Sequence, residues 1–79
     1  MRHHLEIIKD IENFLAANNL DNELVAFQYE VRAGSTGSEV CGRVGSWLMS
    51  NQINGLEKLT DEFVSYCHLN GLHLKKRSL

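Results

Sequence analysis

The chain has 79 residues, of which 43% are hydrophobic and 23% are charged, and its formal net charge is −2. This length holds one hydrophobic core, and the composition is that of a globular protein rather than a disordered one. No apolar run reaches the roughly 18 residues that cross a bilayer, and the N-terminus lacks the apolar run of a secretory signal. We therefore expect one cytoplasmic domain with no membrane partner.

Charge is distributed unevenly along the chain. Three of the eight basic residues, Lys75, Lys76 and Arg77, lie in the last five positions. Residues 1–74 carry the other five basic side chains and all ten acidic ones, so this part of the chain is acidic. We predict a single helical domain over residues 1–74 and a short basic C-terminal tail over residues 75–79.

The first predicted helix covers residues 5–17. Apolar residues recur at steps of three and four from Leu5 to Leu15, which places them on one helical face. Asn18 and Asn19 follow, and asparagine tolerates the left-handed conformation with which many helices end. Both signals agree on the element and on its C-terminal boundary.

The second predicted helix covers residues 22–33. Its apolar residues from Leu24 to Val31 form a stripe at helical spacing. Asp21 or Asn22 suits the N-cap, because a short polar side chain there accepts a hydrogen bond from the first turn. A glycine follows the last residue of the segment, as is common after a helix.

The same segment has an alternative interpretation as a strand. A strand would place Val25, Phe27, Tyr29 and Val31 on one face and the polar Gln28, Glu30 and Arg32 on the other, which is the pattern of a half-buried strand. A strand over residues 24–32 would pair with one over residues 39–48 and give an α-β-β-α arrangement with a central hairpin. We favour two helices, because the capping signals occupy specific positions and a lone hairpin makes a thin sheet.

The third predicted helix covers residues 37–50, directly after a glycine- and serine-rich break. Thr36 and Glu39 have the spacing of a capping box at its start. Gly42 and Ser46 are four residues apart, so they form a strip of small side chains along the helix. Such a strip permits close approach of another backbone, either within this chain or from a second copy.

The fourth predicted helix covers residues 56–70. Leu59 and Phe63 begin its apolar stripe, Asn54 fits the N-cap, and Gly71 fits the position after the last turn. The sequence therefore predicts an all-α, compact four-helix domain.

No catalytic, metal-binding or cofactor-binding motif is recognisable in the chain. Cys67, His68 and His73 lack the paired ligands that a zinc site requires, and no serine or cysteine lies in a nucleophile signature. We expect no enzymatic activity, no metal and no cofactor. We interpret Cys41 and Cys67 as reduced core residues, with a disulfide between them as the alternative.

The function predicted from these features is protein–protein contact by a small regulatory domain. Val25 and Tyr29 face away from the apolar stripe of the second helix, and Gly42 and Ser46 form the small strip of the third. These four residues are the predicted interface. The partner is expected to be another protein or a second copy of the chain.

The alternative function is that of a DNA-binding transcriptional regulator. The helices at residues 22–33 and 37–50 are joined by a short glycine-containing break, as in a helix-turn-helix. Arg43 on the outer face of the third helix and the tail residues Lys75, Lys76 and Arg77 are then the candidate contacts with nucleic acid. We rank this alternative second, because an acidic domain repels phosphates over most of its surface.

Overall fold

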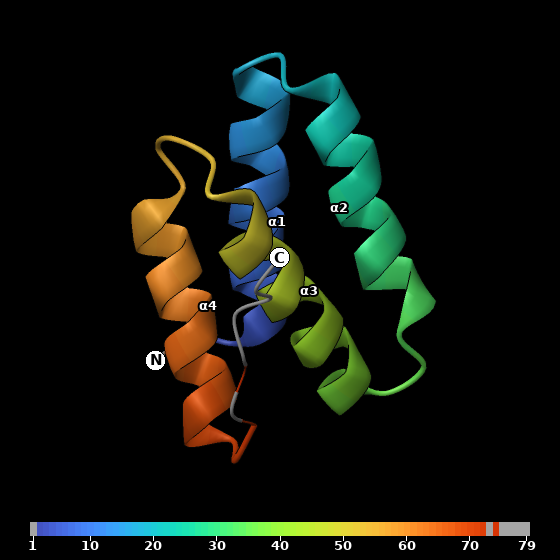
Figure 1. The fold of residues 1–79 in the computed structure, drawn as a ribbon, viewed down its shortest axis with the longest axis vertical. Coiled ribbons are helices and arrows are strands. Elements are labelled where there is room, and N and C mark those ends of the chain that lie inside the picture. The colour runs from blue at the N-terminus through green and yellow to red at the C-terminus, as the bar shows by residue number, and fades with distance from the viewer. Residues whose placement is uncertain (1, 73, 75–79) are drawn as a thin grey trace.

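The structure is a computed structural model that describes residues 2–72 and 74 (Figure 1). These residues fold as a compact all-α domain of four helices and contain no strand. The four-helix prediction is therefore confirmed. The helices are α1 (His4–Ala17), α2 (Asp21–Ala33), α3 (Gly37–Asn51) and α4 (Glu57–Leu69).

The alternative with a central hairpin is wrong. Residues 24–32 lie within α2, and residues 39–48 lie within α3. A strand would have placed Val25, Phe27 and Tyr29 on one face, whereas only Phe27 is buried and the other two are exposed. The burial pattern of this segment follows the helical period, which points Phe27 into the core and leaves Val25 and Tyr29 exposed.

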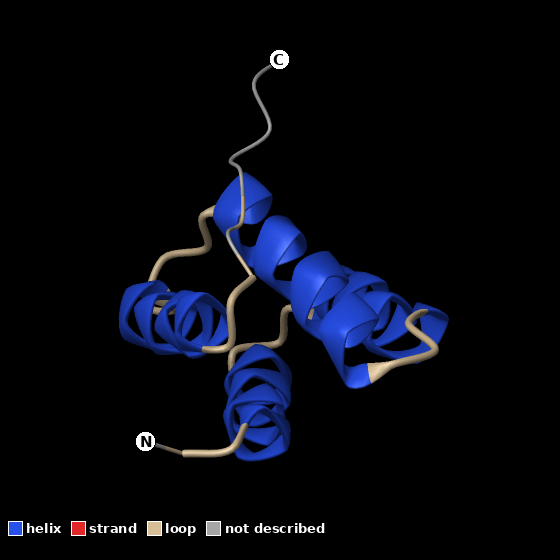
Figure 2. Ribbon diagram, turned by 90° about the horizontal axis from the view of Figure 1, so that it is seen from below, coloured by secondary structure: helices blue, strands red, loops and turns tan. Residues whose placement is uncertain are grey.

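The four helices form a closed ring of neighbours. α1 packs against α2 and α4, and α3 packs against the same two helices from the other side. Seen from below, the helices surround one shared interior (Figure 2). α2 and α4 therefore occupy opposite positions in the ring, and each has an outer face that no other helix covers.

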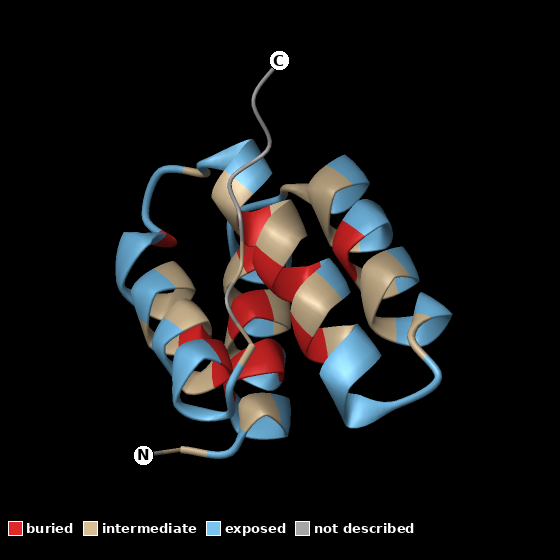
Figure 3. Cartoon of the chain, turned by 60° about the horizontal axis from the view of Figure 1, so that its bottom comes forward, coloured by how far each residue is buried: buried red, intermediate tan, exposed pale blue. Residues whose placement is uncertain are grey.

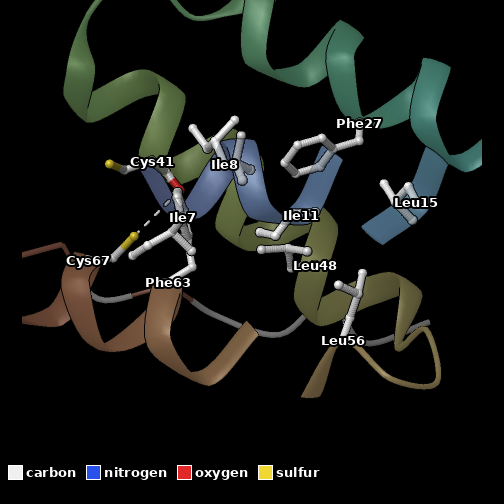
Figure 4. Close-up of a cluster of buried hydrophobic side chains, with 11 residues drawn as sticks. Ile7, Ile8, Ile11, Leu15, Phe27, Cys41, Leu48, Leu56, Phe63 and Cys67 are labelled. Carbon is white, nitrogen blue, oxygen red and sulfur yellow. Dashed lines mark hydrogen bonds between the residues drawn. The ribbon is translucent and has the colours of Figure 1, made fainter. Parts of the chain in front are cut away.

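All four helices contribute to one hydrophobic core, and the buried positions face this shared interior (Figure 3). α1 supplies four of its buried side chains, whereas α2 supplies only Phe27. α2 is therefore the helix least anchored by burial. The buried residues are Ile7, Ile8, Ile11, Leu15, Phe27, Cys41, Val44, Leu48, Leu56, Phe63 and Cys67 (Figure 4).

Three of the predicted helix ends are confirmed. Thr36 is the N-cap of α3, and its Oγ1 accepts a hydrogen bond from the backbone N–H of Glu39 at 3.1 Å. Asn19 follows α1 with a left-handed φ of 57°. Gly71 has a φ of 81° after α4, and the Leu72 N–H donates to the Cys67 carbonyl at 2.8 Å, as in a Schellman motif.

Two predicted N-caps are wrong. α4 begins at Glu57 after Leu56, rather than after Asn54. Gly55 has a positive φ of 94°, and the next residue, Leu56, is buried in the core and occupies the N-cap position of α4. α2 begins at Asp21 and has no side-chain cap, because its N-cap position is Leu20.

The chain that follows α4 returns along α3. Leu72 and Leu74 pack against the core, and a Cβ atom added at Gly45 would collide with the Leu74 side chain. Gly45 is therefore the small residue of α3 that admits another segment of the same chain. The predicted basic tail, residues 75–79, lies outside the described residues. Within the described part, no helix is long and apolar enough to cross a membrane.

Candidate functional site

Two large apolar side chains lie exposed on the outer face of α2. Val25 is 68% exposed and Tyr29 is 63% exposed. They are four residues apart on one helix, so their side chains are neighbours on the same face. Both belong to the predicted interface, and the structure places them where a partner can reach them.

Arg43 of α3 lies beside the ring of Tyr29. The guanidinium carbon of Arg43 lies 6.0 Å from the centre of the Tyr29 ring, which is a cation–π distance. The same arginine is paired with Glu30 of α2, with 3.1 Å between Nε and Oε1. Arg43 therefore connects the two helices across the edge of the exposed patch.

A surface hollow of about 270 Å³ adjoins this pair between α2 and α3. Gly42 and Ser46, the other two predicted interface residues, both line it. Trp47 stands against it, and its ring packs edge-on against Phe27 with 5.4 Å between the centroids. The described residues that line it are Glu30, Gly42, Arg43, Ser46, Trp47, Ser50 and Asn51.

These residues form one surface, here called the α2–α3 surface and defined as Val25, Tyr29 and the lining of the hollow. Gly42 and Ser46 line the hollow together with Arg43 and Glu30, and Arg43 in turn lies beside the Tyr29 ring. Small side chains at Gly42 and Ser46 leave room for the hollow. Its chemistry is mixed: aromatic and apolar groups stand beside hydroxyls, an amide and a compensated ion pair.

Some members of the α2–α3 surface were not identified from the sequence. Glu30, Trp47, Ser50 and Asn51 line the hollow but are not among the four predicted interface residues. Trp47 is half-buried and serves both the core and the hollow. The sequence signal for the hollow is the four-residue spacing of Gly42 and Ser46. Their small side chains leave one side of the neighbouring Trp47 uncovered.

Of the residues proposed for nucleic-acid contact, the structure describes one. Arg43 is described, and its charge is already matched by Glu30. Lys75, Lys76 and Arg77 lie outside the described residues. The described residues include all ten acidic and only five basic side chains, so their net charge is −5.

The two cysteines lie in the core as free thiols (Figure 4). Burial raises the pKa of Cys67 to about 12 and also raises the pKa of Cys41. The Cys67 thiol donates to the backbone carbonyl of Cys41 over 3.7 Å. At neutral pH both thiols are therefore protonated and poorly suited to nucleophilic attack.

Among the described residues, no group of three or more histidine, cysteine, aspartate or glutamate side chains is arranged to hold a metal ion. His73, one of the residues considered for zinc, lies outside this part of the chain.

The chain matches no protein-family model, and neither the curated proteins nor the solved structures contain a significant match to it.

Proposed function

We propose that this domain binds another protein through the α2–α3 surface and acts without catalysis. One observation carries the proposal: Val25 and Tyr29 are large, apolar and mostly exposed one turn apart on α2, and the Tyr29 ring lies beside Arg43, which lines the hollow. Aromatic anchors next to a pocket are typical of the energetically dominant part of a protein interface.

The contact between Tyr29 and Arg43 favours binding. A side chain whose rotamers are already restricted by a neighbour loses less conformational entropy when a partner covers it. Arg43 is itself restrained by Glu30, so the edge of the patch is partly organised before binding. Tyr29 is therefore the residue from which we expect the largest single contribution to affinity.

Charge indicates the kind of partner. The whole chain carries a net charge of −2 and residues 1–74 carry −5, so the domain attracts a basic protein surface and repels an acidic one. A second copy of the chain would bring the same negative charge to a symmetric interface. We therefore favour a basic protein partner over self-association, which remains the second possibility for this surface.

The DNA-binding alternative has less support. Its only described contact residue, Arg43, already pairs with Glu30 and packs on Tyr29. Contact with a phosphate or a base would have to displace these interactions on an acidic domain. The remaining candidates, Lys75, Lys76 and Arg77, would act as a weak and salt-sensitive tail.

Photocrosslinking in the cells that produce the protein tests the proposal. A photoreactive amino acid at Ala26, which is exposed on α2 next to Val25, should form a covalent adduct with one discrete protein. The matched probe at Ser65, exposed on the opposite helix α4, should not form that adduct. An adduct of twice the mass of the chain indicates self-association, and equal adducts at both positions contradict the proposal.

A further inference from the structure

The core contains a pair of thiols that the proposed function does not use. Cys41 comes from α3 and Cys67 from α4, and both are buried. The Cys67 sulfur points toward the backbone of Cys41, with its thiol donating to the carbonyl of that residue over 3.7 Å (Figure 4). Each thiol is also close enough to influence the ionisation of the other.

The thiol pair has a route to the surface. A hollow of about 300 Å³ is lined by both Cys41 and Cys67, together with His4, Tyr66 and Leu72. Cys41 lies nearer to solvent, because it is 6% exposed whereas Cys67 is fully buried. We therefore expect a small reagent that enters this hollow to react first at Cys41.

We propose that Cys41 and Cys67 are an oxidative modification site, at which a small disulfide converts them into an intramolecular disulfide that joins α3 to α4. The deprotonated sulfur of Cys41 attacks one sulfur of the reagent and releases the first small thiol. The sulfur of Cys67, after losing its own proton to solvent, attacks the mixed disulfide at Cys41 and releases the second. Two cysteines are oxidised, and one small disulfide is reduced to two thiols.

The expected consequence is a large rise in thermal stability. The bond would close a long loop, because Cys41 and Cys67 are 26 positions apart in the sequence. A cross-link of this span restricts the unfolded chain and should raise the unfolding temperature by ~10 °C or more in a domain of this size. Since α3 and α4 already pack together, the native fold needs no new contact between helices.

The reaction should be slow at neutral pH and faster in mild alkali. Burial holds both thiols in the protonated form, and the thiolate is the attacking species. Among the residues that the structure describes, the other titratable groups that line the hollow are His4 of α1 and Tyr66 of α4. Neither carries a positive charge in alkali that would stabilise a thiolate, so the rate should follow the ionisation of the cysteines.

The test treats the folded protein with bis(2-hydroxyethyl) disulfide at about pH 9, where thiol exchange proceeds readily. Mass spectrometry after alkylation should show a monomer that has lost two hydrogen atoms and has no alkylated cysteine. The unfolding temperature should rise, and a reducing agent should reverse both changes. Cys67→Ala should stop at the mixed disulfide on Cys41 and show no rise.

A control in guanidinium shows that the reagent can close the same loop in the unfolded chain. The proposal is wrong if the unfolded chain forms the disulfide while the folded chain keeps both thiols. It is also wrong if the folded chain stops at a mixed disulfide or forms only intermolecular dimers. A disulfide that lowers the unfolding temperature contradicts it as well, because the native positions of α3 and α4 would then not accommodate the bond.

Discussion

Arg2, which precedes α1, forms a bidentate ion pair with Glu62 of α4. Its Nε and Nη2 atoms donate to the two carboxylate oxygens of Glu62 at 2.9 and 2.7 Å. The remaining terminal nitrogen, Nη1, bonds to Asp10 of α1. One guanidinium therefore ties α1 to α4 at the closing edge of the helical ring.

Glu62→Gln should lower the unfolding temperature at pH 7. The Arg2 guanidinium lowers the pKa of Glu62 below its usual value of 4.5, since hydrogen bonding and charge favour the carboxylate. The stabilisation is thus fully present above pH 4.5 and is lost as pH falls through the lowered value. Thermal unfolding of both proteins across this range should show a difference that closes in acid.

Asp61→Asn is the matched control for this prediction. It removes an exposed carboxylate one position away, on the same helix. The unfolding temperature of Asp61→Asn should match that of the wild type at pH 7 and in acid. An equal loss in the two variants would show that the net charge of α4, rather than the contact with Arg2, is responsible.

His4 should make the domain less stable in weak acid. Burial lowers the pKa of His4 below 6.5, and the neighbouring His3 lowers it further, while His4 Nδ1 lies 3.2 Å from the Tyr66 hydroxyl. The unfolded chain then binds more protons than the folded one between the lowered value and pH 6.5, so stability falls as pH falls through this window. An NMR titration in which His4 has a midpoint at or above 6.5 would refute this.

Gly55→Ala should be more damaging than Gly71→Ala. Both glycines have positive φ values, 94° and 81°, which cost a residue with a side chain about 1 kcal/mol. A Cβ at Gly55 would in addition lie 2.6 Å from Cζ of Phe14, whereas nothing lies within 4 Å of a Cβ at Gly71. We expect losses of roughly 2–4 and about 1 kcal/mol respectively, measured by denaturant unfolding.

Gly37→Ala is the control for helix propensity. Gly37 lies at the start of α3 with open space around it and no positive φ, so this change should leave stability unchanged or raise it slightly. Similar losses at Gly55 and Gly71 would mean that backbone strain alone acts there. The contact with Phe14 would then make no contribution.

Phe27 and Tyr29 should differ sharply in their effect on stability, although they are two positions apart. Phe27 is fully buried and is the main anchor of α2, so Phe27→Ala should cost about 3–5 kcal/mol and remove most of the stability of a domain this small. Tyr29→Ala loses only an exposed ring contact with Arg43 and should cost less than about 1 kcal/mol. Circular dichroism during denaturant unfolding measures both values.

The sequence was sufficient to predict elements whose signals are local. The period of three and four residues and the caps at Thr36 and Gly71 indicated helices, and the same period placed Val25 and Tyr29 outside the apolar stripe. These features depend on neighbours within one or two turns, so they can be recognised without the fold.

Contacts between distant segments could not be predicted in this way. Arg2 and Glu62 are 60 positions apart, and nothing in either segment identifies the other. Gly45 lowers helix propensity, and its benefit appears only when the returning chain brings Leu74 against it. Val25, Tyr29, Gly42 and Ser46 were selected from the pattern of their own helices, whereas the hollow, with Glu30 and Trp47 in its lining, arises from how α2 and α3 pack.

The most direct test of the central claim repeats the photocrosslinking at Ala26 in two matched variants, each of which replaces one exposed apolar residue with serine. Tyr29→Ser removes an exposed apolar residue from the α2–α3 surface, and Leu69→Ser removes one that is 72% exposed on α4. If the α2–α3 surface binds a protein partner, Tyr29→Ser should abolish the adduct and Leu69→Ser should leave it intact, with both variants folded. An adduct that survives Tyr29→Ser, or that both variants weaken equally, would contradict the account.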